Sequence, residues 1–188
     1  AHVLHTNPSY ISPAVEAFYL RDPIAVRPLV TKDISTLKFP PEDFVTVSVK
    51  FTKVGFAQLR SQIFNPPPAW TDVIPRIKEP PVDLGMKLTC GFEMLLSDPQ
   101  NKDKRSVREI DVLLLDIDTG DDSLPDDKEI AAWPRTKDDE KWLEIDYNDF
   151  ENELAGDKKK SGNTGGKGFG DASAQENLRK MVSRFADF

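Results

Sequence analysis

The chain has 188 residues, a formal net charge of −7, 30% charged residues, one Cys and two His. A single Cys excludes an internal disulfide and a thiolate zinc site, and no apolar run approaches the ~20 residues that cross a bilayer. The N-terminus has no signal-peptide pattern, so we expect a protein of the cytosol or nucleus. Because the chain begins at Ala1 without a Met, we also expect it to be a piece of a longer protein.

The negative charge is concentrated in the middle third of the chain. Residues 98–160 hold 11 Lys and Arg against 20 Asp and Glu, whereas residues 1–97 hold 10 against 9. A segment with net charge −9 repels phosphate backbones, so we expect no direct nucleic-acid binding by it. Thirteen of the 15 prolines lie in residues 1–99, which indicates a compact first half and an extended acidic second half.

Residues 1–97 predict a small helical module with one short strand. Ser12-Pro13 is typical of a helix start, Thr52 is a candidate N-cap for the next helix, and a third helix is expected from Asp83 to about Ser97. The proline-rich segment 66–81 predicts extended chain. Apolar residues alternate with polar ones over residues 45–51, which predicts a half-buried strand carrying Val45, Val47, Val49 and Phe51.

The second half predicts short helices separated by polar segments. Ser106 and Glu109 have the spacing of a capping box at the start of an apolar-faced helix, an acidic turn follows over 118–127, and a helical turn follows over 129–133. Residues 156–170 are rich in Gly and Lys and predict a flexible linker. Residues 171–188 predict a tethered amphipathic docking helix with a stripe of Leu178, Met181, Val182 and Phe185.

The predicted fold class is therefore mainly α. Its parts are a helical module with a short strand (1–97), an extended acidic partner-binding arm (98–155), a flexible linker (156–170) and a C-terminal docking helix (171–188).

Four enzyme or metal interpretations are weaker than a binding one. Asp116-Ile117-Asp118 after a leucine run resembles a phosphatase nucleophile loop, but that chemistry needs a strand where the sequence predicts a helix. The same acids fail the register of a calcium loop. His2 and His5 have no third ligand nearby. A catalytic Cys90 would need a His partner, and the chain has only those two His, so we expect no metal, no cofactor and no enzyme activity.

Acidic and aromatic residues are interleaved between positions 133 and 150. Such a segment repels itself and commonly binds a larger basic protein surface, with aromatic side chains buried as anchors. The alternative is a helix that packs on its own domain with a solvated acidic face. We predict partner binding, and the candidate residues are Trp133, Trp142, Leu143, Ile145, Phe150, Leu178, Met181, Val182 and Phe185.

Four blocks of sequence resemble the ecdysoneless family, in a fungal type of member. They are SPAVEAFYLRDPI at residues 12–24, FTK and AQL at 51–53 and 57–59, DLGMKL running into GFEML over 83–95, and DEKWL at 139–143. The resemblance implies a non-enzymatic, largely helical factor of nucleus and cytoplasm. It implies a link to pre-mRNA splicing and ribonucleoprotein assembly through the central spliceosomal scaffold protein, and links to transcription regulation and the cell cycle.

The resemblance also implies a link to the RuvB-like ATPase chaperone complex. In relatives that link depends on an acidic phosphoserine motif of the Asp-Ser-Asp-Asp type, whereas this chain has Asp122-Ser123-Leu124-Pro125. We therefore do not carry that contact over. The predicted function is a chaperone-like assembly factor for the scaffold protein; the alternative is a transcriptional regulator acting through the acidic segment.

Overall fold

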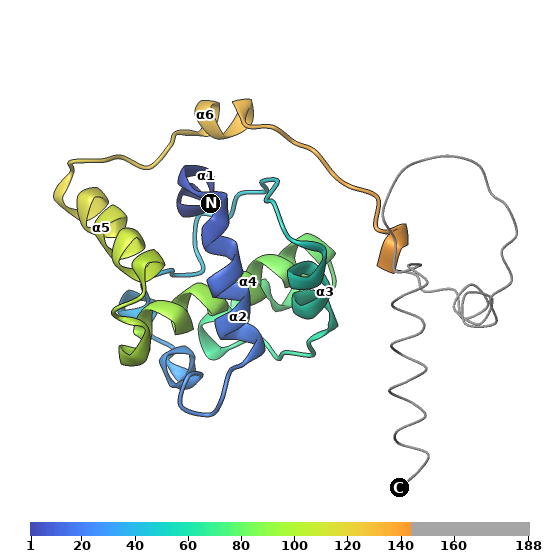
Figure 1. The fold of residues 1–188 in the computed structure, drawn as a ribbon, viewed down its shortest axis with the longest axis horizontal. Coiled ribbons are helices and arrows are strands. Elements are labelled where there is room, and N and C mark those ends of the chain that lie inside the picture. Colours follow the sequence, from blue (N-terminus) through green and yellow to red (C-terminus); the bar gives the residue numbers. More distant parts are fainter. Residues whose placement is uncertain (144–188) are drawn as a thin grey trace, which may run out of the picture. The chain divides into compact units, whose positions relative to one another are not determined.

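The computed structural model describes residues 1–143, and over these residues the fold is helical with no β-strand (Figure 1). The mainly α prediction is confirmed. The α-helices are α1 (His2–Thr6), α2 (Ile11–Tyr19), α3 (Lys53–Ser61), α4 (Pro80–Ser97), α5 (Arg105–Thr119) and α6 (Asp127–Ala132). Short 3-10 helices cover Pro8–Tyr10, Arg27–Val30, Ile34–Thr36, Pro68–Arg76, Pro99–Asn101 and Lys141–Leu143. The predicted linker and docking helix lie outside the described residues.

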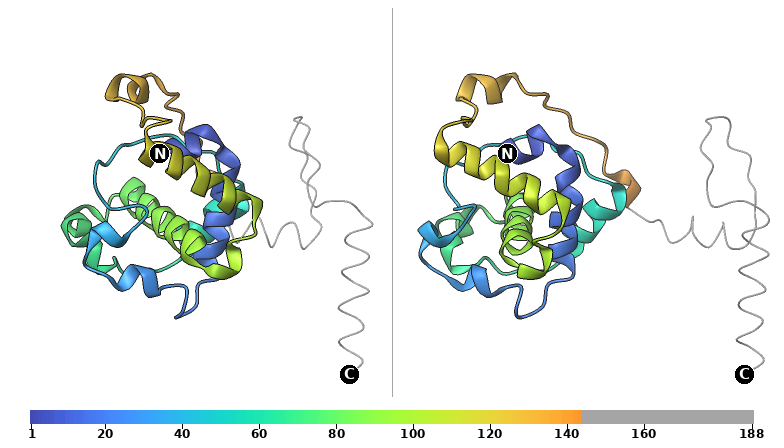
Figure 2. Two further views of the ribbon diagram at one scale, coloured as in Figure 1. Left: turned by 90° about the vertical axis from the view of Figure 1, so that its left-hand side faces the viewer. Right: turned by 60° about the vertical axis from the view of Figure 1, so that its left-hand side comes forward.

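Helix α4 is the centre of the fold, and α2 crosses it while α3 packs beside both (Figures 1 and 2). The close crossing requires Gly91: a Cβ at this position would lie 2.3 Å from the carbonyl oxygen of Ala14 and 3.2 Å from Cβ of Phe18. Ala14 and Phe18 are fully buried, so two helix backbones meet here with no side chain between them. This contact fixes the position of α2 on α4.

Helix α5 extends the core beyond the predicted module boundary at residue 97. Its first turns contribute Val107 and Ile110, which are buried with the side chains of α2 and α4. The Tyr10 hydroxyl donates to Glu109 Oε2 at 2.9 Å, and Arg105 Nε donates to Glu109 Oε1 at 2.6 Å. The N-terminal half of α5 is therefore attached to the body of the fold.

The predicted strand over residues 45–51 is wrong. The chain there has no regular secondary structure, and no backbone hydrogen bond joins residues 43–51 to another described segment. Val49 and Phe51 nevertheless pack against the core, while Val45 is exposed. The alternating pattern therefore reflects an irregular segment that places alternate side chains on a helical core, which has the same period of two as a strand.

Several predicted helix boundaries are also corrected. Helix α2 begins at Ile11 after a 3-10 turn capped by Asn7, so Ser12 is not its N-cap. Helix α5 begins at Arg105, and Glu109 bonds to other side chains, so the Ser106 capping box does not form.

The proline-rich segment is not extended, because it forms the 3-10 helix Pro68–Arg76 and the first turn of α4, which starts at Pro80. Thr52 is the N-cap of α3, as predicted: its hydroxyl accepts a hydrogen bond from the amide of Gly55. Within residues 1–143, no helix combines the length and apolar character needed to cross a bilayer.

Candidate protein-binding surface

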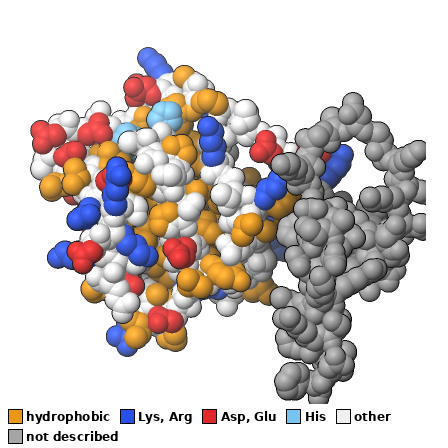
Figure 3. All heavy atoms as spheres, in the orientation of Figure 1, with side chains coloured by type: hydrophobic (Ala, Val, Ile, Leu, Met, Phe, Trp, Pro, Cys, Tyr) orange, Lys and Arg blue, Asp and Glu red, His pale blue; other side chains and the backbone are white. Residues whose placement is uncertain are grey.

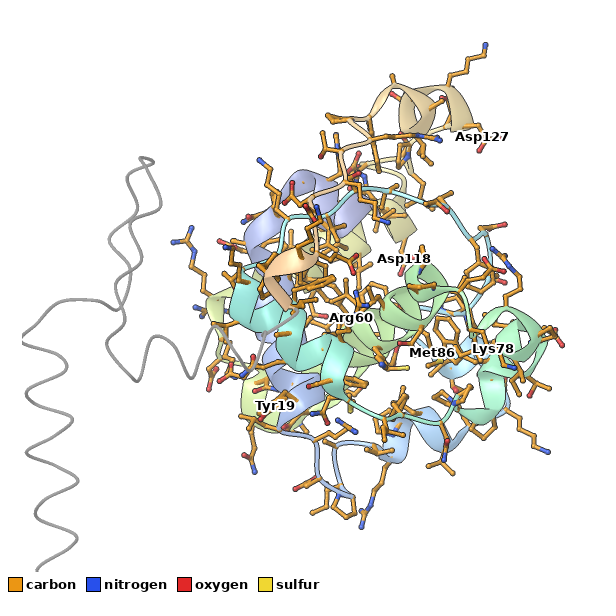
Figure 4. All side chains as sticks on the ribbon, turned by 90° about the vertical axis from the view of Figure 1, so that its right-hand side faces the viewer. Tyr19, Arg60, Lys78, Met86, Asp118 and Asp127 are labelled. Carbon is orange, nitrogen blue, oxygen red and sulfur yellow. The ribbon has the colours of Figure 1, made fainter. Side chains whose placement is uncertain are left out.

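An acidic segment leaves α5 and returns along the body of the fold; we call residues 121–143 the return segment. Helix α5 ends at Gly120, whose φ of 80° ends the helix in the left-handed conformation. Acidic side chains gather over the C-terminal end of α5 and the turn after it (Figure 3). Asp118 and Asp127, labelled in Figure 4, lie on either side of this turn and are exposed.

The return segment contains one well-capped helix, α6. The Asp126 carboxylate accepts hydrogen bonds from the amides of Lys128 and Glu129, and Glu129 Oε2 accepts from the amide of Asp126 at 2.8 Å. This capping box explains why α6 begins at Asp127, and it needs no contact with the core. The rest of the segment is irregular up to Glu140.

The first contact of the return segment with the body is on α1. The rings of Trp133 and His5 are stacked, with centroids 3.9 Å apart and planes at 5°. Nearby, His2 Nε2 lies 3.3 Å from Asp122 Oδ2. The backbone amide of Ser123 and, to a lesser extent, His2 lower the pKa of Asp122, so this carboxylate stays ionised. The N-terminal helix thus holds the start of the segment by stacking and a polar contact.

The second contact is on α3. Trp142 packs at an angle against Phe56, with centroids 6.1 Å apart, and Lys53 Nζ lies 5.5 Å from the centre of the Trp142 ring. Arg60, labelled in Figure 4, forms an ion pair with Glu140. Upstream of α3, the Ser48 hydroxyl donates to the carbonyl oxygen of Thr136 at 2.7 Å.

The structure describes three of the nine candidate partner-binding residues. Trp133 and Trp142 contact α1 and α3, and Leu143 lies in the 3-10 helix that also contains Trp142. The candidates outside the described residues are Ile145, Phe150, Leu178, Met181, Val182 and Phe185. Their role in partner binding stays a prediction.

Sequence reasoning missed the surface of the body that receives the return segment. That surface is formed by Lys53, Phe56 and Arg60, which we call the α3 face, together with His5 on α1. The signal was present as a cation–aromatic–cation stripe at spacings of three and four residues, which places the side chains on one side of a helix. Nothing in the local pattern indicates what covers that stripe.

The geometry does not favour the enzyme interpretations. Asp116 and Asp118 lie inside α5 and not in a loop after a strand. Among residues 1–143, no cluster of three or more His, Cys, Asp or Glu side chains could hold a metal ion. Burial, and to a lesser extent the nearby charge of Glu93, raises the pKa of Cys90 to about 12, so this thiol is not a ready nucleophile.

The comparisons with known proteins agree with the family resemblance. A family model described as SGT1 protein matches residues 1–112. A protein named ecdysoneless homolog from Schizosaccharomyces pombe is 37% identical over 153 residues, which is 80% of this chain and 24% of that protein. Ecdysoneless homologs from Arabidopsis thaliana and Dictyostelium discoideum are 34% and 30% identical, over 50% and 56% of this chain and 15% and 13% of those proteins.

No solved structure matches this chain. The chain spans about a quarter of the fission yeast relative and a smaller share of the other two. The match to more than half of the chain nevertheless shows the family, and the resemblance inferred from the sequence blocks is confirmed by the names of the relatives. The chain belongs to the SGT1 protein family, and three curated relatives of it are named ecdysoneless homologs.

Proposed function

We propose that this chain is a non-enzymatic, chaperone-like assembly factor whose acidic arm binds the central scaffold protein of the spliceosome. The process would be pre-mRNA splicing and the assembly of small nuclear ribonucleoproteins, in nucleus and cytoplasm. The observation that carries the proposal is the return segment: an acidic stretch that is attached to the body by a few exposed side-chain contacts and has no core of its own.

Charge gives the proposed mechanism. The net charge of −9 over residues 98–160 favours a basic partner surface and steers its approach. Aromatic side chains such as Trp133, Trp142 and Phe150 would supply the buried contacts that hold the complex. On a scaffold whose basic surface receives RNA, the acidic arm would occupy that surface until RNA replaces it.

Affinity measurements with the purified scaffold protein test this proposal. In the double variant Trp142→Ala, Phe150→Ala we expect the affinity to fall at least about tenfold, because buried aromatic residues dominate such interfaces. Tyr19→Ala is the matched control: Tyr19 is 43% exposed, Trp142 is 37% exposed, and Tyr19 lies outside the arm. Equal affinities of the double variant and the unchanged chain would refute the proposal.

The second candidate is a transcriptional regulator, which the same acidic-aromatic pattern favours. It predicts that residues 110–155, fused alone to a DNA-binding domain, activate a reporter gene. Activation without measurable affinity for the scaffold protein would favour this second function. A link to the RuvB-like chaperone complex stays a further proposal, and the replacement of the Asp-Ser-Asp-Asp motif weakens it.

A further inference from the structure

We propose that the α3 face is a docking site for an acidic peptide carrying a tryptophan, and that its resident ligand is residues 136–143 of the same chain. In this arrangement the body of the fold covers part of the Trp142 ring in cis until a partner replaces the α3 face. The inference rests on the proposed function only for the identity of that partner; the intramolecular site stands on its own contacts.

The α3 face has the chemistry of a peptide site. Lys53, Phe56 and Arg60 follow one another at i, i+3 and i+7 along a single helix, so their side chains lie on one side of it. Thr52 caps the first turn, which fixes the start of this stripe. The α3 face therefore presents a cation, an aromatic ring and a second cation along one side of the helix. This arrangement suits a ligand in which aromatic and acidic groups alternate.

The return segment supplies a complementary group for each of these three side chains. Glu140 pairs with Arg60, and the Trp142 ring lies against both Phe56 and Lys53. The residues from 139 to 143 read Asp-Glu-Lys-Trp-Leu, so the acid and the ring are two positions apart. The segment and the α3 face are joined by an ion pair, a cation–π contact and an aromatic pair. The ion pair recognises a carboxylate and the other two contacts recognise an aromatic ring, so together they select an acidic peptide with a Trp.

The contacts are suited to reversible docking. Arg60, Glu140 and Trp142 remain 37–45% exposed, and exposed ion pairs and cation–π contacts are individually weak. The segment stays docked because it is joined to the same chain, which gives it a high effective concentration at the site. A partner with a larger basic and aromatic surface can therefore displace it without unfolding the body.

Limited trypsin digestion of the whole 188-residue chain tests the docking. In Arg60→Glu we expect cleavage after Arg135 and Lys137 to be about three- to tenfold faster, because the ion pair becomes a repulsion. The charge swap Arg60→Glu, Glu140→Arg should restore the slow rate. Lys32→Glu, an exposed charge reversal outside α3, is the matched control and should leave the rate unchanged. Equal rates in all four chains would overturn the proposal.

A peptide experiment identifies the ligand. We expect a labelled peptide of residues 136–143 to bind the variant Glu140→Ala, Trp142→Ala, whose own segment no longer fills the site, about tenfold more tightly than it binds the unchanged chain. Adding Phe56→Ala to that variant should remove the binding. Equal binding of the peptide to the unchanged chain and to the variant would refute the claim that residues 136–143 fill the site of their own chain. A dimer that forms with rising concentration and dissociates in Arg60→Glu would refute it as well.

The outcomes separate this inference from the proposed function. If the α3 face holds the segment in cis, Arg60→Glu should bind the purified scaffold protein several-fold more tightly, because Trp142 is released while the arm is unaltered. Faster trypsin cleavage of Arg60→Glu with no change in scaffold affinity would support the intramolecular site. It would also show that Trp142 does not contribute to binding the scaffold protein.

Discussion

Replacement of Gly91 by alanine tests whether the direct contact of α2 and α4 determines the stability of the fold. The added Cβ would lie 2.3 Å from the carbonyl oxygen of Ala14. That oxygen belongs to the backbone of a buried helix, so it cannot turn aside as a flexible side chain can. The two helices must separate by about 1 Å to reach ordinary van der Waals contact.

The cost follows from this displacement. Overpacking a close-packed core costs about 1–3 kcal/mol and sometimes more, and a gap of 0.5–1 Å along the helix interface removes about a quarter to a half of each dispersion contact. Alanine regains about 1 kcal/mol through its higher helix propensity. We therefore expect Gly91→Ala to lower the free energy of unfolding by about 2 kcal/mol or more.

Gly85 provides the matched control in the same helix. A Cβ at Gly85 meets no atom within 4 Å, so Gly85→Ala should raise the free energy of unfolding by about 0.5–1 kcal/mol through helix propensity alone. Urea unfolding followed by circular dichroism measures both variants. A Gly91→Ala chain as stable as Gly85→Ala would show that α2 does not cross α4 at this contact.

Three further predictions concern buried and capping groups. Burial raises the pKa of Cys90 from 9.0 to about 12, so the contribution of the neutral thiol to stability is fully present below pH 9 and is lost as the pH rises towards 12. Urea unfolding at a series of pH values should show this loss of stability, and the loss should be smaller in Cys90→Ala. Glu93, which is 3% exposed, accepts hydrogen bonds from the amides of Lys38 and Phe39, so Glu93→Ala should cost about 1–3 kcal/mol and speed amide exchange at Phe39. Thr52→Ala should cost about 1 kcal/mol in the same unfolding assay by removing the cap of α3, and an unchanged midpoint would contradict the cap.

Sequence patterns predicted the elements whose causes are local. The apolar spacing of α4 and the threonine cap of α3 depend on residues within a few positions of one another, so both helices were expected near their observed places. The predicted strand failed because a period of two is shared by strands and by an irregular segment that lies on a helical core, where Val49 and Phe51 pack. The capping box at Ser106 failed because Glu109 bonds to Tyr10, 99 residues away.

The partners of the return segment could not be predicted for a related reason. Arg60 and Glu140 are 80 positions apart, and Ser48 and Thr136 are 88 apart, so no local pattern connects them. Composition could indicate that an acidic, aromatic segment binds a basic, aromatic surface. It could not indicate that the same chain presents such a surface, since residues 1–97 have a net charge of only +1 and the two cations of the α3 face are a small part of their total.

The two interpretations of the acidic arm, partner binding and packing on its own domain, are therefore compatible. An exposed segment with two tryptophans would be prone to non-specific association before it met its partner. Docking on α1 and α3 covers part of each ring with weak contacts, and the acids other than Glu140 remain exposed for the first approach of a basic surface. Under the proposed mechanism the Trp142 ring would contact first the body and then a partner, so its contact with the body must be weak. The exposed ion pair and the tilted aromatic pair are contacts of that kind.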